Sequence, residues 1–257
     1  MTAKVPRDDL VTLAALGVVA FVCCDLLHEW AGHGAACLAT GGRVATLSTV
    51  HLQCMGGWQR LVSGAGIGVN LFAGALCLLW LRHLRNASIH LRYFLWLLAA
   101  YNLFTGCGYV VGSSLRDAGD LAQALRGVAW RGCSVALGLA AYAWSILAAT
   151  RALRRFATAV GAAQAWRLIL PPYFAAAAVA CAAAARNAIL PSTVLMAVST
   201  TLGAWGFLFL PLAWRFGSPA NVSEPVTRHA RWVLGAAITA AIFVGALGPG
   251  IRLHATR

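Results

Sequence analysis

Residues 10–39 read LVTLAALGVVAFVCCDLLHEWAGHGAACLA, an apolar run longer than the ~20 residues that a helix needs to cross a bilayer. The run carries no charge before Asp25, and then a polar cluster begins that also contains His28, Glu29 and His33. Ionisable side chains inside a membrane span are costly and mark functional sites by default. The stretch therefore predicts a membrane helix whose carboxyl-terminal part breaks, tilts or borders a cavity.

The composition of the whole chain agrees with membrane residence. Of its 257 residues, 60% are hydrophobic and 11% are charged, whereas soluble domains carry about 25% charged residues. This excludes a soluble enzyme, a disordered chain and a small disulfide scaffold. Further apolar runs cover 62–81, 93–113, 132–150, 168–190, 193–214 and 231–248. We expect an all-α, multi-pass integral membrane protein of six to seven transmembrane helices, in a bacterial cell membrane.

Three segments between or within these runs have their own patterns. Residues 40–61 alternate Val, Leu and Thr between glycine pairs, which predicts a short hairpin or a re-entrant segment. Residues 114–131 are amphipathic and predict an interfacial segment. Pro171 and Pro172 fall in the first turn of the fifth run, where proline is tolerated, and Pro191 separates the fifth run from the sixth.

The charges are unequal: 20 Lys and Arg against 7 Asp and Glu, a net charge of +13. The basic residues lie between the apolar runs and form no contiguous face, so we expect contact with the lipid bilayer and no nucleic-acid partner. Across seven spans the larger share falls on the amino-terminal side, which predicts a cytoplasmic N-terminus. The acids are Asp8, Asp9, Asp25, Glu29, Asp117, Asp120 and Glu224. Most of the eight cysteines lie inside apolar runs, where we expect burial and no redox role.

His28, Glu29 and His33 supply the groups of a zinc peptidase: two imidazole ligands and a carboxylate that activates the zinc-bound water. The usual H-E-x-x-H motif spaces its histidines i, i+4 on one helix face. Here the spacing is i, i+5, which leaves the two imidazoles roughly 140° apart on an ideal helix. A π-bulge absorbs one inserted residue, and Gly32 and Gly34 ease that distortion. The alternative is a pair of polar residues hydrogen-bonded between helices.

The stretch HEWAGHGAACLATGGRV, residues 28–44, resembles the first core helix and following turn of site-2-protease-type intramembrane metalloproteases, the M50 peptidase clan. It has one residue more between Glu29 and His33. The H-E-x-x-G-H form also occurs in the soluble dipeptidyl-peptidase III group. The likeness covers about residues 15–125.

The resemblance implies a third zinc ligand. The segment 101–120, YNLFTGCGYVVGSSLRDAGD, is similar to the family's Asp motif without its proline, so the alignment points to Asp120, with Asp117 as the fallback. Both acids could instead be interfacial charges near a helix start. His51, Cys54, Cys37 and Cys107 stay open as alternative ligands.

Two buried amides are further candidates. The stretch 64–70 resembles the family's A-G-P-x-x-N helix and ends at Asn70, and Asn102 opens the Asp motif. Both could line a substrate cavity and bind an extended peptide or an oxyanion, and we expect Asn102 to bind substrate; interhelical packing is the alternative for Asn70. Asp25 could orient an imidazole.

The expected function is that of an intramembrane zinc metalloendopeptidase. His28, His33 and Asp120 would hold Zn²⁺, and Glu29 would be the catalytic general base. A transmembrane protein or peptide would be the substrate. We expect residues 1–125 to form a three-helix protease-like core and 126–257 to add helices of unknown role. The alternatives are a non-catalytic protease-like membrane scaffold and a metal-ion transporter.

Overall fold

The computed structural model describes residues 8–84, 86–127, 130–156, 162–187, 204–216 and 224–253. Within this part of the chain, six helices are long and apolar enough to cross a membrane, and one shorter apolar helix lies before the last of them. The protein is an all-α, multi-pass membrane protein, as the composition predicts. Helices suit this environment because they satisfy every backbone N–H and C=O within one segment.

The first span is continuous from Leu10 to Ala39 but changes its winding. It consists of α1 (Leu10–Leu26), a π-helical segment (Leu27–Gly34) and α2 (Ala35–Ala39). Asp9 caps α1, because its carboxylate accepts from the Thr12 N–H at 2.8 Å. The π-helical segment contains His28, Glu29 and His33, and it confirms the predicted bulge.

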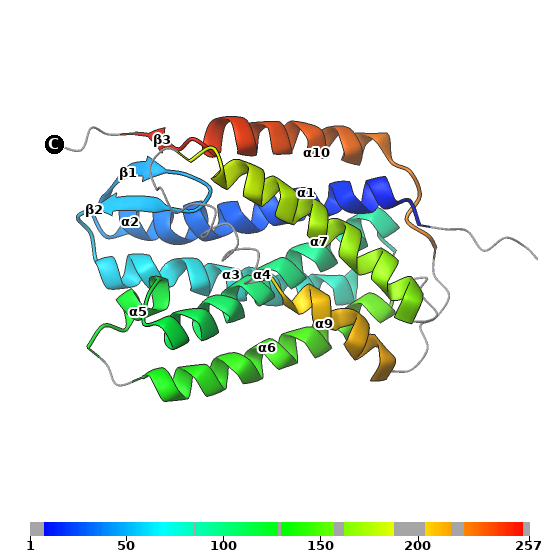
Figure 1. Ribbon diagram of the computed structural model, residues 1–257, viewed down its shortest axis with the longest axis horizontal. Helices are drawn as coiled ribbons and strands as arrows, with labels where there is room; N and C mark the ends of the chain where they lie inside the picture. Colours follow the sequence, from blue (N-terminus) through cyan, green and yellow to red (C-terminus); the bar gives the residue numbers. More distant parts are fainter. Residues whose placement is uncertain are drawn as a thin grey trace, which may run out of the picture.

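A three-stranded sheet lies at the end of this span (Figure 1). Strands β1 (Arg43–Leu47) and β2 (Leu52–Met55) pair antiparallel, which confirms the hairpin predicted for 40–61. Gly41 and Gly56 adopt positive φ at its two ends. The sequence did not predict β3 (Ile251–Arg252), a segment near the C-terminus that pairs with the other edge of β1.

The remaining helices form a bundle around α1 and α4. They are α3 (Gln59–His83), α4 (Ile89–Arg116), α5 (Asp120–Ala124), α6 (Arg131–Arg154), α7 (Ala162–Ala184), α9 (Gly206–Ala213) and α10 (Ala230–Ile242). The described part of the predicted run 193–214 is α9 with its neighbouring turns; the rest of that run, including Pro191 and Ser192 before it, lies outside the described residues. The predicted interfacial segment contains the end of α4 and the short α5.

One prediction about α7 is wrong. The helix begins at residue 162, so Pro171 and Pro172 lie inside it and not in its first turn. Pro172 has no N–H for the Leu168 carbonyl four residues earlier. The Tyr93 hydroxyl of α4 donates to that carbonyl instead, so a neighbouring helix supplies the missing hydrogen bond.

The main hydrophobic core joins both halves of the chain. Phe207 of α9 lies against Tyr101 and Phe104 of α4, with ring centroids 4.6 Å and 5.4 Å apart. Residues of α1, α6 and α7 belong to the same buried cluster. The proposed division at residue 125 remains a prediction, but the helices on its two sides pack together through shared side chains.

Candidate metal centre

The π-helical segment places the two histidines on one face of the first span. A π-helix bonds residue i to i+5, so residues five apart lie one above the other. The imidazoles of His28 and His33 are therefore neighbours, with ring centroids 4.7 Å apart. Both side chains are buried. The extra residue between Glu29 and His33 is accommodated by the winding of the helix.

Each imidazole is held through its Nδ1 atom by α3. The His28 Nδ1–H donates to the Asn70 side-chain oxygen at 2.8 Å, and the His33 Nδ1–H donates to the Val62 carbonyl at 2.7 Å. In a neutral imidazole a protonated Nδ1 leaves a lone pair on Nε2. Both Nε2 atoms are thus available as metal ligands, and their partners fix the ring orientations as ligand-supporting groups do in metal sites.

Asp120 completes a group of three donor atoms. Its Oδ2 lies 3.4 Å from the Nε2 atoms of both His28 and His33, and these two nitrogens lie 3.2 Å apart. A tetrahedral ion with bonds of about 2.0–2.1 Å to nitrogen and oxygen separates its ligands by about 3.3 Å. The spacing of the three atoms matches that value. Two imidazole nitrogens and a carboxylate oxygen that converge in this way could hold a metal ion.

The turn between α4 and α5 brings Asp120 to the histidines. Asp117 ends α4 in the left-handed conformation (φ 52°), and Gly119 follows with φ 86°. Asp120 is then the first residue of α5, and its side chain is 28% exposed. Burial by itself raises the pKa of Asp120, but the neighbouring imidazoles of His28 and His33 outweigh it and lower the pKa below its ordinary value. The carboxylate therefore stays ionised and suits a cation.

Close approach of α3 closes the site on another side. A Cβ atom on Gly66 would lie 2.7 Å from His33 Nε2 and 2.8 Å from His28 Cε1. A Cβ atom on Gly32 would lie 2.5 Å from the Gly66 Cα. Only glycine allows the two backbones and the imidazoles to meet here.

Glu29 is buried beside the three donors, with 5% of its surface exposed. Its charge interacts with those of His28, His33 and Asp120. Its Oε2 atom has no hydrogen-bond partner among the described residues. Burial of a carboxylate oxygen without a partner is costly, so this atom is a candidate to meet a water molecule or a ligand.

The structure leaves several predicted residues outside this group. Asp117 is exposed and is not part of it. Asn102 is fully buried in α4: its amide donates to the Leu98 carbonyl at 2.8 Å, and its Oδ1 has no partner among the described residues. A substrate-binding role for Asn102 stays a prediction. The partner of His28 Nδ1 is Asn70, so Asp25 does not orient that nitrogen.

The cysteines proposed as alternative ligands are otherwise engaged. Cys37 and Cys54 form a disulfide, which the sequence did not predict, so neither offers a thiolate. The burial expected of the cysteines in apolar runs is confirmed for Cys24 and Cys77 and is wrong for Cys133 and Cys181, which are exposed. Cys107 lies buried against the Ser145 hydroxyl at 3.7 Å. His51 is not in the metal-binding group found among the described residues.

Two contacts of the site were not predicted from the sequence: the Val62 carbonyl and the ring of Tyr109. The Tyr109 ring stacks on His28 with centroids 4.8 Å apart. No sequence pattern identifies a single backbone carbonyl, and the sequence gives Tyr109 no role beyond its place in the segment 101–120.

Comparisons with protein-family models, with curated proteins and with solved structures find no match to this chain.

Replacement of Asn70 tests whether its hydrogen bond to His28 contributes to metal binding. We expect Asn70→Leu to weaken zinc binding about 10–100-fold, because the His28 ring loses the acceptor that fixes its tautomer. The matched control is Asn102→Leu, which removes another buried amide that does not touch His28. Competition with a chelator of known affinity measures the change. Equal zinc affinities in Asn70→Leu and the wild type would show that Asn70 has only a packing role.

Proposed function

We propose that this protein is an intramembrane zinc metallopeptidase that hydrolyses a peptide bond in a membrane-embedded segment. The observation that carries the proposal is the convergence of His28 Nε2, His33 Nε2 and Asp120 Oδ2 at tetrahedral spacing, with Glu29 buried nearby and its Oε2 without a hydrogen-bond partner among the described residues. Three protein ligands with one position left open are typical of catalytic zinc sites. The resemblance of residues 28–44 to site-2-type proteases supports the same function.

Zn²⁺ bound at this site would act as a Lewis acid and lower the pKa of a water molecule. The protein groups then have separate tasks. Glu29 takes the proton from the attacking water and later gives it to the leaving amine. Asn70 and Val62 keep the two Nε2 atoms directed at the metal. The substrate is a transmembrane segment with locally unwound backbone, because a helical peptide bond is shielded by its neighbours.

The donor set supports the peptidase over the two alternatives. A scaffold has no need of a buried carboxylate oxygen without a partner near three converging donor atoms. A transporter needs a polar path through the bundle. In α6 the described buried polar groups, Ser145 and Thr150, donate to carbonyls of their own helix and offer no such path. The observations therefore favour the enzyme.

Membranes from cells that produce the wild type and the Glu29→Gln variant provide the test. Mass spectrometry of protein N-termini compares the two samples. We expect new N-termini inside transmembrane segments of other proteins in the wild-type sample only. If both samples show the same N-termini while the wild type contains zinc, the protein binds the metal without this activity.

The zinc affinity should depend on pH in a defined direction. Zinc requires both imidazoles unprotonated, so protonation of either one opposes binding. The lowered pKa of Asp120 keeps its carboxylate ionised while the imidazoles take up protons. Protons therefore compete at two ligands, so the apparent affinity should fall as the pH is lowered, by roughly a hundredfold per pH unit where both imidazoles are protonated in the metal-free protein. Equilibrium dialysis from pH 7.5 to pH 5 measures this, and an affinity independent of pH would exclude histidine ligands.

A further inference from the structure

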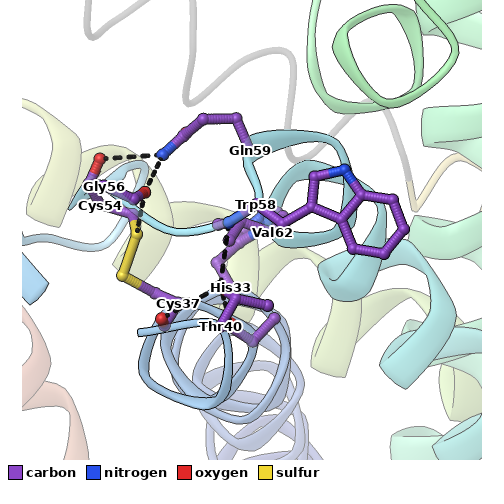
Figure 2. The surroundings of a disulfide bond; sticks show 9 residues. His33, Cys37, Thr40, Cys54, Gly56, Trp58, Gln59 and Val62 are labelled. Carbon is purple, nitrogen blue, oxygen red and sulfur yellow. Dashed lines mark hydrogen bonds between the residues drawn. A yellow bond between two sulfur atoms is a disulfide. The ribbon is translucent and has the colours of Figure 1, made fainter. Parts of the chain in front are cut away.

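The disulfide lies near His33 of the candidate metal centre (Figure 2). Cys37 follows His33 by four residues and is fully buried in α2, and Cys54 belongs to β2. The hairpin is tied to the same helix a second time, because the Trp58 N–H donates to the Thr40 hydroxyl at 3.1 Å. The bond thus fixes the hairpin to the carboxyl-terminal end of the first span.

A short segment of the chain connects Cys54 of the disulfide to Val62, whose carbonyl binds His33. The Gln59 side chain donates to the carbonyls of Cys54 and Gly56, and α3 begins at Gln59. One turn later the Val62 carbonyl accepts from His33. The disulfide, the hairpin and the metal centre therefore occupy one end of the bundle, together with α5 and β3 (Figure 1).

A disulfide bond persists in an oxidising compartment and is rare in the cytosol, where thiols are kept reduced. The end of the bundle that carries Cys37–Cys54 thus fits the non-cytoplasmic face of a membrane. The Leu253 N–H donates to the Ala45 carbonyl at 2.8 Å, so the C-terminal strand belongs to the same end.

The distribution of arginines gives an independent indication. At the end where α1 begins, the described arginines at helix ends and in turns are Arg82, Arg92, Arg151, Arg154, Arg155, Arg167, Arg215, Arg228 and Arg231. At the hairpin end they are Arg43, Arg60, Arg116, Arg126, Arg131, Arg186 and Arg252. Cytoplasmic loops carry the excess of basic residues. The richer end is the one opposite the disulfide, so the two observations agree.

We infer that the metal centre opens toward the oxidising, non-cytoplasmic side of the membrane. Its substrates are then polypeptide segments that enter the bilayer from that side, which in a bacterial cell is the periplasmic face. The substrate class rests on the proposed function, whereas the orientation does not. The exposure of the site fits this orientation. Asp120 is the most exposed of the three proposed ligands, and it lies on α5 at the hairpin end.

Thiol labelling tests the orientation in the full-length protein. The background is Cys133→Ser/Cys181→Ser, which removes the two exposed free thiols among the described residues. Two reporters are then compared: Gln123→Cys in α5 and Asn86→Cys in the turn between α3 and α4, both at exposed positions. A membrane-impermeant maleimide is added to spheroplasts before and after permeabilisation.

We expect Gln123→Cys to react in intact spheroplasts and Asn86→Cys to react only after permeabilisation. The reverse order would overturn the inference. A second measurement covers the case that a reporter variant does not fold: wild-type protein, denatured directly from cells, should gain two mass-tagged thiols when it is reduced before labelling. Labelling of all cysteines without reduction would also overturn it. Neither readout depends on zinc or on Glu29, so the inference and the proposed function can fail separately.

Discussion

Glu29→Gln should abolish peptide-bond hydrolysis and leave the zinc content unchanged. The amide has the size of the carboxylate but cannot take a proton from water, and general acid–base catalysis contributes about 10²- to 10⁴-fold to such reactions. Glu29 is buried beside the ligands without being one of the three converging donors. The rate of cleavage and the bound zinc are measured on the same purified sample.

The first span provides a matched control for this variant. Asp25 lies one helical turn before Glu29, is partly exposed, and does not belong to the metal-binding group. Asp25→Asn also neutralises an acid in this span, and it should retain cleavage within a few-fold. Full activity in Glu29→Gln would contradict the proposed mechanism, and loss of zinc from it would make Glu29 a ligand.

Gly66→Ala should remove zinc binding, with a loss of affinity of at least about a hundredfold. The new methyl group would overlap His33 Nε2 and His28 Cε1. Those rings cannot turn aside without breaking the Nδ1 hydrogen bonds to Val62 and Asn70. Outer contacts of this kind are worth 10–100-fold in metal affinity, and here two are disturbed together.

Gly68→Ala is the control for that prediction. Gly68 belongs to the same helix, α3, and a Cβ atom there has no atom within 4 Å among the described residues. Alanine is also the better helix former, so this variant should fold and bind zinc like the wild type. Chelator competition on both variants gives the comparison. Equal zinc affinity in the two variants would show that the imidazoles do not occupy the positions described above.

Much of the fold could be predicted because membrane residence restricts it. Apolar length alone locates the spans, and a glycine-bounded alternation locates the hairpin. The π-helical segment could be predicted as well, because an i, i+5 histidine pair can reach one ion only if the helix accommodates an extra residue. The prolines of α7 were misplaced because the start of that helix is set by residues 162–167, which are less apolar than the run that follows.

The contacts around the histidines required the structure. Asn70 was a candidate for cavity lining, and only the packing of α3 against the first span shows that it holds His28. The disulfide joins cysteines 17 positions apart that were each considered as single ligands. Their pairing depends on how the hairpin packs against α2, and no local sequence pattern determines that packing. The pairing of β3 with β1 brings together residues from opposite ends of the chain for the same reason.

The zinc content of the purified protein tests the central claim most directly. Elemental analysis after dialysis against metal-free buffer should find about one zinc ion per chain in the wild type and in Glu29→Gln. The variants His33→Ala and Asp120→Ala should each lose it, because either change removes one of three converging ligands. A wild-type protein that binds no zinc when supplied with it, or a His33→Ala variant that binds zinc equally well, would contradict the account.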